Sequence, residues 1–460
     1  MVFSSTVFLF LFLPALLLLY YLPLKSRTWK NLILLLFSIG FYAWGEPVFV
    51  FLMLFSILVN WLLSLQIDRS ARRKKAWLTL AIVLDVILIG IFKYASFFSR
   101  NLAAWTGNDK WLIDIALPIG ISFFTFQLMS YVFDVYYGNA KAQKNPLYVA
   151  LYISLFPQLI AGPIVRYEQI ENEITDRRES FDDFAEGARR FIYGLGKKVL
   201  LANFVAQIAD NVFDHVSDPS VMTAWLGAIA YTMQIYFDFS GYSDMAIGLG
   251  RMFGFHFLEN FNYPYLAGSV TDFWRRWHIS LSTWFRDYVY IPMGGNRVPK
   301  ARWIWNLFVV WALTGIWHGA NWTFLLWGLL YFVVLLFEKQ SGWVKKMGPL
   351  SHLYTMLVVI LAWVFFRSPD IQSGWHFIGC MFGVHARGFA DGFFTETVKA
   401  TYTVLIPALI GVTPLVKNLF DWLKKRNLIF FENIWLMLVF FFSVLEIISA
   451  SYNPFIYFNF

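Results

Sequence analysis

The sequence predicts an all-α, polytopic integral membrane protein with about eleven transmembrane helices, together with re-entrant and amphipathic interfacial helices. Apolar residues make up 58% of the 460 residues and charged residues only 14%, where a soluble domain usually carries about a quarter charged residues. The mean hydropathy is +0.56. The apolar residues form long runs near the ~20 residues that a helix needs to cross hydrocarbon, and Trp and Tyr gather near the ends of these runs, where amphipathic rings suit the headgroup layer.

The first apolar runs and the loops between them orient the chain. Residues 1–22 have no basic start and no small-residue cleavage site, so we expect a first span rather than a signal peptide. Basic residues cluster at 25–30 and at 69–75, and two runs separate these clusters. Both clusters therefore lie on one side, which the positive-inside rule makes cytoplasmic, with the N-terminus outside. We expect a multi-pass protein of the cytoplasmic (inner) cell membrane.

Later stretches interrupt this pattern. Residues 156–163 carry Pro157, Gly162 and Pro163 in an apolar stretch too short to span twice, which predicts a re-entrant segment, because broken backbone at membrane depth must be buried in protein or line a cavity. Between 241 and 302, aromatic residues alternate with polar ones at about helical spacing, which predicts amphipathic interfacial helices. Twelve apolar runs are candidates for the about eleven spans: 1–22, 31–44, 48–65, 76–92, 115–136, 191–213, 221–239, 304–317, 322–337, 353–366, 402–416 and 434–448.

Composition limits the remaining functions. The one cysteine, Cys380, excludes an internal disulfide and a Cys-rich metal site. The net charge of +8 is expected to reflect cytoplasmic loops that contact membrane lipid or an anionic donor, rather than nucleic acid. No internal repeat or soluble domain is visible, so we treat residues 1–460 as a single membrane-embedded domain.

Two segments place histidine where a plain span would have leucine. The first is FWRRWHISLSTWFRDY at 273–288, in which helical spacing would put His278 on one face with Ser282 and with Arg275. An amphipathic helix at the membrane surface would explain its Trp and Arg residues without any function.

The second segment is LTGIWHGANW at 313–322, where His318 lies between apolar runs. The flanking glycines allow another backbone or a ligand to approach closely. An ionisable residue at membrane depth suggests function, because leaving it unpaired is costly. The alternative is a neutral imidazole hydrogen-bonded to a helix carbonyl.

These segments, taken with four others in order, resemble the membrane-bound O-acyltransferase family, and most closely its bacterial alginate O-acetylation branch. The other motifs are SFFTFQ at 122–127, PQLIAGPI at 157–164, YFDFSGYSD at 236–244 and NFNYPY at 260–265. We place the family core at about 117–337.

The resemblance implies that His318 matches the family's intramembrane catalytic histidine and His278 the second, upstream one. It implies transfer of an acyl group, most often acetyl, from a cytoplasmic thioester to a hydroxyl of an extracytoplasmic polysaccharide or partner protein. The expected donor substrate is acetyl coenzyme A or an acyl carrier thioester, with no permanently bound cofactor. A separate extracytoplasmic acetyltransferase is an expected partner, as in the biosynthesis of alginate and other exopolysaccharides.

The chemistry of the residues agrees with such a transfer. A hydroxyl that attacks a thioester needs a base, and a desolvated imidazole suits this task, so we assign it to His318. His278 could orient His318, protonate the departing thiol or line a donor tunnel between the two histidines. Phosphates of the donor would need cations, although positive-inside anchoring explains these equally well; the main candidates are Arg275, Arg276, Arg286 and Arg297, followed by Lys300 and Arg302. Acids that could pair with these arginines or with a histidine are Asp238, Asp244, Asp272 and Asp287.

Other classes of function stay open at this stage. A polysaccharide or acyl-group transporter also uses broken helices and buried charges, but no two-half symmetry is visible here. A scaffold without its own catalysis is a further alternative. A metal enzyme has no support from ligand spacing, because no HxxxH or HxxE pair accompanies either histidine. We expect no function for His215, His256, His352, His376 and His385.

Overall fold

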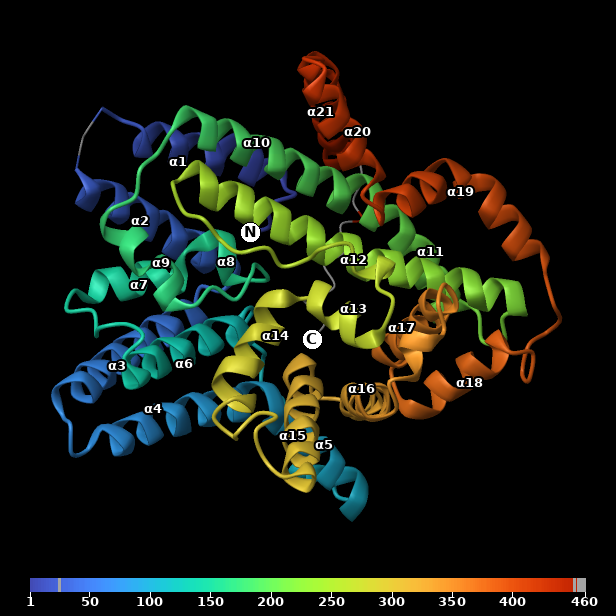
Figure 1. The fold of residues 1–460 in the computed structure, drawn as a ribbon, viewed down its shortest axis with the longest axis horizontal. Helices are drawn as coiled ribbons and strands as arrows, with labels where there is room; N and C mark the ends of the chain where they lie inside the picture. The colour runs from blue at the N-terminus through green and yellow to red at the C-terminus, as the bar shows by residue number, and fades with distance from the viewer. Residues whose placement is uncertain (24–25, 450–451, 453–460) are drawn as a thin grey trace. The chain divides into compact units, whose positions relative to one another are not determined.

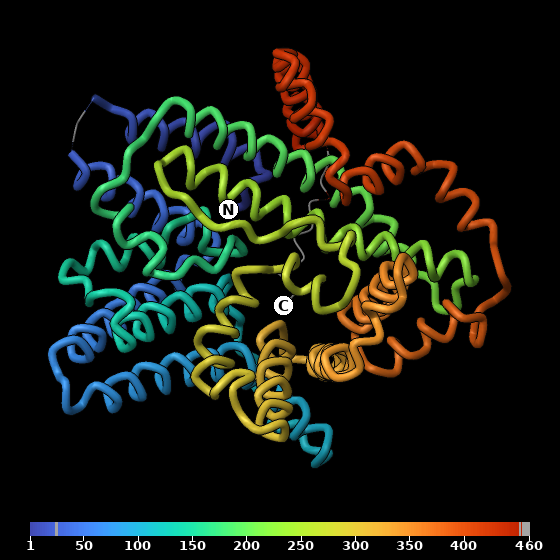
Figure 2. The backbone as a smooth tube through the Cα atoms, in the orientation of Figure 1, coloured from blue at the N-terminus to red at the C-terminus, as the bar shows by residue number. Residues whose placement is uncertain are grey.

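The computed structural model describes residues 1–23, 26–449 and 452, and these residues form helices, turns and loops without any strand (Figures 1 and 2). The predicted all-α class is therefore confirmed. Contacts along the chain define two compact units. Unit 1 comprises Met1–Phe191 and Ser243–Leu258, and unit 2 comprises Ile192–Tyr242 and Glu259–Phe460. The single domain over residues 1–460 stays a prediction.

Unit 1 is built from the helices of the N-terminal half. They are α1 (Leu13–Tyr20), α2 (Arg27–Gly45), α3 (Phe49–Arg69), α4 (Lys74–Ile89), α5 (Ala95–Thr106), α6 (Ile121–Tyr137), α7 (Pro146–Ser154), α8 (Phe156–Leu159), α9 (Tyr167–Thr175) and most of α10 (Phe181–Gly196). Helices α3, α4 and α6 pack against one another (Figure 1). Gly120 precedes α6 with a φ of 76°, a conformation that glycine adopts without strain.

The segment predicted to be re-entrant forms a broken and buried stretch of unit 1. Helix α7 ends at Ser154, Leu155 interrupts the helical path with a ψ of 110°, and the short α8 follows. All residues from 151 to 165 are buried. A Cβ on Gly162 would lie 2.6 Å from the Cα of Gln158, so only glycine fits this turn. The freed backbone is buried in protein, as the prediction required, while its place in a bilayer stays a prediction.

Unit 2 carries the helices of the second half. They are η4 (Lys197–Ala202), α11 (Asn203–His215), most of α12 (Val221–Met252), α13 (Val270–Arg276), α14 (Ile279–Phe285), η6 (Arg286–Tyr290), α15 (Lys300–His318), α16 (Trp322–Ser341), α17 (Leu350–Arg367), α18 (Ile371–Met381), α19 (Gly392–Gly411), α20 (Leu415–Lys425) and α21 (Ile429–Ser449). Helices α15 and α16 pack together, α16 packs on α17, and α17 packs on α18. This chain of contacts positions His318 at the end of α15, and α13, which packs on α16 and α17, leads into His278.

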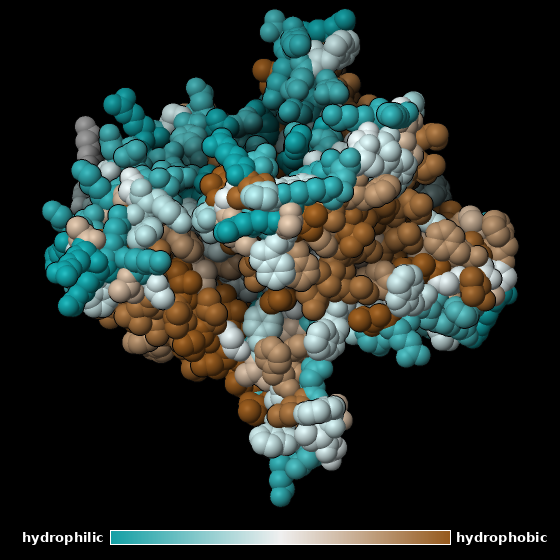
Figure 3. All heavy atoms as spheres, turned by 60° about the horizontal axis from the view of Figure 1, so that its bottom comes forward, coloured by the Kyte–Doolittle hydropathy of each residue, from teal (hydrophilic) through white to brown (hydrophobic). Residues whose placement is uncertain are grey.

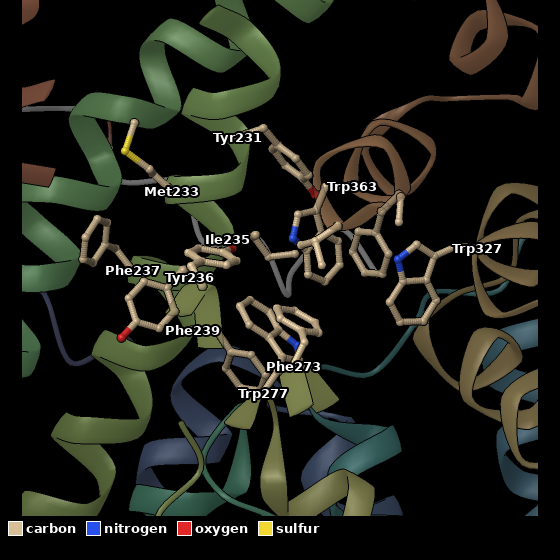
Figure 4. Packing of buried hydrophobic residues seen from close by; sticks show 14 of the residues in the cluster. Tyr231, Met233, Ile235, Tyr236, Phe237, Phe239, Phe273, Trp277, Trp327 and Trp363 are labelled. Carbon is tan, nitrogen blue, oxygen red and sulfur yellow. The ribbon is translucent and has the colours of Figure 1, made fainter. Parts of the chain in front are cut away.

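An aromatic cluster forms the core of unit 2. The ring centroids of Trp277 and Trp363 lie 5.0 Å apart, and Trp363 stacks on Trp327 at 5.8 Å (Figure 4). All three side chains are buried, and such pairs add about 0.5–1.5 kcal/mol each beyond the burial of their area. The cluster therefore joins the residue after α13 to α16 and α17 through rigid rings.

Five helices in the described ranges are long and apolar enough to cross a membrane. They are Phe49–Arg69, Lys74–Thr106, Trp322–Ser341, Leu350–Arg367 and Ile429–Ser449, and the pair α19 and α20, bent by 68°, would make a sixth. Broad apolar areas lie on the surface (Figure 3), as expected for contact with lipid. The predicted count of about eleven spans is not confirmed, since other runs form shorter or more polar helices; α6 has 17 residues.

Candidate active site

His278 stands at a break between two helices of unit 2. Helix α13 ends at Arg276 and α14 begins at Ile279, and the chain bends between them (Figure 1). His278 has a φ of 43°, in the left-handed region, which costs a non-glycine residue about 1–2 kcal/mol. The uninterrupted helical spacing expected across 273–288 is therefore wrong at this point.

Backbone hydrogen bonds from an upstream segment explain the break. The N–H of Asn262 donates to the carbonyl of Arg276 at 2.9 Å, and the N–H of Ile279 donates to the carbonyl of Asn260 at 3.0 Å. These two bonds flank Trp277 and His278. They replace helical bonds with bonds to the 260–262 segment, and they hold His278 in its strained conformation.

The side chain of His278 is fully buried. Its Nδ1 lies 3.2 Å from Oδ1 of Asn260 and 3.4 Å from Oγ of Ser280. The Phe239 ring meets the imidazole edge-on, with centroids 4.5 Å apart. Burial lowers the pKa of His278 well below its ordinary value, and His318 adds to this lowering. We therefore expect a neutral imidazole in the resting protein.

His318 ends α15 in an aromatic setting. The Trp317, Trp327 and Phe366 rings meet its imidazole edge-on at centroid distances of 5.0, 4.9 and 5.2 Å. Trp327 belongs to α16 and Phe366 to α17, and His318 is 5% exposed. Three helices thus supply the walls around this histidine.

Glycines bring α15 and α16 close together beside His318. A Cβ on Gly315 would lie 2.5 Å from the carbonyl oxygen of Phe324 on α16, and a Cβ on Gly319 would collide with the ring of the same residue. The close approach expected at these glycines is therefore made by the neighbouring helix.

One tryptophan adjoins both motif histidines. The ring centroid of Trp317 lies 5.9 Å from that of His278 and 5.0 Å from that of His318. The two histidines thus belong to one site in unit 2, although they lie far apart in sequence. A continuous tunnel that links them stays a prediction.

The four arginines predicted to bind the donor differ in their surroundings. Arg276 pairs with Asp272 at 2.9 Å, and Arg286 pairs with Asp287 at 2.6 Å. The pairing expected for these two acids is confirmed. Arg275, Arg286 and Arg297 are all exposed, whereas Arg276 is half-buried. The assignment of the four arginines to a donor stays a prediction.

The other two acids have different partners from those expected. Asp238 pairs with Lys198 of η4 at 2.6 Å, with both side chains buried, and Asp244 pairs with Arg190 at 2.9 Å within unit 1. Partners that lie on other helices have no signal in local spacing. The only local signal for this pair is the presence of Lys197 and Lys198 inside the otherwise apolar run 191–213.

Several site residues were not predicted. Asn260 lies in the NFNYPY motif and Ser280 in the first histidine segment, but neither had a role, and the aromatic rings of Phe239, Trp327 and Phe366 were not connected to a histidine. Within residues 1–23, 26–449 and 452, no group of three or more His, Cys, Asp or Glu side chains could hold a metal ion.

Comparison with known proteins places the chain in a family. The model of the membrane-bound O-acyltransferase family matches residues 143–383, a range that contains both motif histidines. The chain belongs to the membrane-bound O-acyltransferase family. It is therefore a multi-pass membrane protein and an O-acyltransferase.

Relatives match the chain well beyond the site. A probable alginate O-acetylase of Pseudomonas aeruginosa is 38% identical over the whole of both chains. A protein of the same name from Azotobacter vinelandii is 45% identical over 88% of this chain and 82% of its own. A peptidoglycan O-acetyltransferase of Helicobacter pylori is 33% identical over 100% of this chain and 98% of its own.

Proposed function

We propose that this O-acyltransferase moves an acetyl group from a cytoplasmic thioester donor to a hydroxyl of an extracytoplasmic polysaccharide or partner protein, with His318 as base. The observation that carries the proposal is the burial of His318 among aromatic rings, next to a tryptophan that also contacts His278. Removal of water strengthens the interactions of an imidazole with a reacting hydroxyl.

The reaction balances with an imidazole as proton carrier. The hydroxyl oxygen bonds to the thioester carbonyl carbon while His318 takes the hydroxyl proton. The carbon–sulfur bond then breaks, and its electron pair leaves with sulfur. The thiolate receives the proton, so the products are an ester and a free thiol.

The names of the relatives and the charge of the exposed arginines support the proposed donor and acceptor. The names of the relatives specify O-acetylation of alginate and of peptidoglycan, which favours acetyl as the group and an envelope polysaccharide as the final acceptor. We propose acetyl coenzyme A or an acyl carrier thioester as donor, and a separate extracytoplasmic acetyltransferase as partner. Arg276 and Arg286 are already paired with aspartates, so the exposed Arg275 and Arg297 are the better placed of the four arginines to meet donor phosphates.

The proposed location is the cytoplasmic membrane, with the N-terminus outside and about eleven crossings. The two basic clusters on one side of the first spans support this orientation. Beyond the five helices that meet the length and hydropathy criteria, the remaining crossings would come from shorter or more polar helices such as α6 and α12.

Thiol release by purified protein in nanodiscs tests the proposal. Acetyl coenzyme A and an acetylated carrier protein serve as parallel donors, with alginate or peptidoglycan oligosaccharides as the hydroxyl acceptor, and wild type is compared with His318→Ala and His278→Ala. We expect release by wild type with one donor and background release by folded His318→Ala. Release that is equal in all three proteins would overturn His318 as base. Absence of release with both donors would overturn the proposed thioester donors.

A further inference from the structure

The hydrogen bonds around His278 identify which ring nitrogen carries the proton. The backbone N–H of Ser280 lies 3.2 Å from Oδ1 of Asn260, and a backbone N–H can only donate. The atom that Asn260 turns toward this site is therefore its carbonyl oxygen. Ser280 Oγ donates to the same oxygen at 2.9 Å, which fixes the orientation of the amide.

An acceptor at this position determines the tautomer. His278 Nδ1 lies 3.2 Å from Oδ1 of Asn260, so Nδ1 must carry a hydrogen to form the bond. In a neutral imidazole the other nitrogen then has a lone pair and no hydrogen. His278 Nε2 is buried and has no hydrogen-bond partner among residues 1–23, 26–449 and 452. A buried acceptor without a partner is costly, and this cost points to a ligand that donates to it.

The Asn260 segment also sets the backbone under His278. The carbonyl of Asn260 accepts a hydrogen bond from the N–H of Ile279, and the N–H of Asn262 donates to the carbonyl of Arg276. Backbone and side chain of one segment therefore fix the position, the ring orientation and the tautomer of His278 together.

We infer that Asn260 is a positioning residue for His278: it holds the imidazole in the Nδ1–H tautomer, so that Nε2 accepts a hydrogen bond from a hydroxyl or amide group of the bound substrate other than the hydroxyl whose proton His318 takes. The role of His278 rests on the proposed acyl transfer, whereas the tautomer does not. A neutral Nε2 without a hydrogen cannot protonate the departing sulfur. The geometry therefore rules out protonation of the thiol among the roles named for His278, and it adds a role in orienting the bound substrate through Nε2.

The tautomer can be measured in the resting protein. Wild type labelled with ¹⁵N-histidine is reconstituted in nanodiscs, and His278 is assigned among the seven histidines by comparison with His278→Gln. We expect a protonated, pyrrole-type Nδ1 and a pyridine-type Nε2 at neutral pH. The reverse pattern would overturn the inference, whether or not the protein proves to be an acyltransferase.

Kinetics of Asn260 variants separate positioning from folding. Asn260→Ala is expected to lower kcat for thiol release by about 10- to 100-fold with little change in KM, because the orientation of an imidazole that acts in the transition state is lost. Asn260→Asp keeps an oxygen against Nδ1–H but adds negative charge, which stabilises the imidazolium. It should restore activity at high pH and shift the acid limb of kcat/KM to higher pH.

Asn262→Asp is the matched control for charge. Asn262 lies in the same segment, its side chain is exposed, and it bonds to Arg276 through its backbone, so its pH profile should equal that of wild type. An acid limb that does not move in Asn260→Asp would overturn the inference while leaving the acyl transfer in place. If Asn260→Ala does not fold, the inference is still tested by the tautomer of His278 in wild type and by the pH profile of kcat/KM in Asn260→Asp.

Discussion

The two motif histidines differ in what holds them. His278 is bound through Nδ1 to a side chain from a distant segment, in a strained backbone conformation that hydrogen bonds maintain. His318 ends a long helix and is enclosed by the rings of Trp317, Trp327 and Phe366. Directional polar bonds therefore hold His278, while the packing of aromatic rings holds His318.

We therefore expect the two histidines to respond differently to substitutions of their neighbours. A hydrogen bond selects one orientation and one tautomer, so small polar substitutions near His278 should act on protonation. Aromatic packing excludes water and sets position, so substitutions near His318 should act through volume.

The largest expected effect is the loss of His318 itself. His318→Gln keeps the approximate size and polarity but removes the base, and we expect thiol release to fall by about 10²- to 10⁴-fold with no change in melting temperature. His215→Gln is the control, because His215 is exposed at the end of α11. Equal activity of His318→Gln and wild type would exclude His318 as base.

The shared tryptophan should produce the next largest effect. Trp317→Leu removes the ring that adjoins both histidines, and we expect kcat to fall about tenfold, which corresponds to about 1.4 kcal/mol in the barrier. Trp305→Leu on the same helix is the control, since Trp305 is 57% exposed. If both variants lose activity equally, general damage to α15 rather than the shared ring is responsible.

Helix packing beside His318 gives a smaller, volume-dependent effect. Gly315→Ala would place a methyl group 2.5 Å from the carbonyl oxygen of Phe324, so we expect a loss of about 1–3 kcal/mol in the free energy of unfolding together with reduced activity. Gly40→Ala in α2 meets nothing within 4 Å and should instead stabilise by about 0.5–1 kcal/mol. Thermal unfolding in detergent distinguishes them, and a neutral Gly315→Ala would contradict the close packing.

The smallest effect concerns pH. His278 has a lowered pKa in the folded protein because it is buried, so the unfolded chain binds its proton more readily. The contribution of the neutral His278 to the free energy of unfolding is fully present above the ordinary histidine pKa of about 6.5, and it decreases as the pH falls below that value. We expect the melting temperature of wild type to decrease more between pH 7.5 and 5 than that of His278→Gln. Parallel decreases would contradict a buried neutral His278.

Sequence reasoning located both histidines but not what holds His278. The helical spacing of 273–288 continues through His278, and nothing local shows that bonds from Asn260 and Asn262 end the helix there. Such tertiary bonds override local periodicity. For the same reason the partner of Asp238 was missed, because Lys198 lies on another helix. The setting of His318 was easier to anticipate, since its glycines and apolar neighbours are adjacent in sequence.

The claim that both histidines form one catalytic unit is tested most directly by a double-variant cycle. Thiol release is measured for wild type, His278→Ala, His318→Ala and the variant with both changes, each shown to be folded. Groups that act as a unit are non-additive, so we predict that the double variant is no slower than the slower single variant. Losses that multiply across the cycle would show two independent histidines and contradict the account.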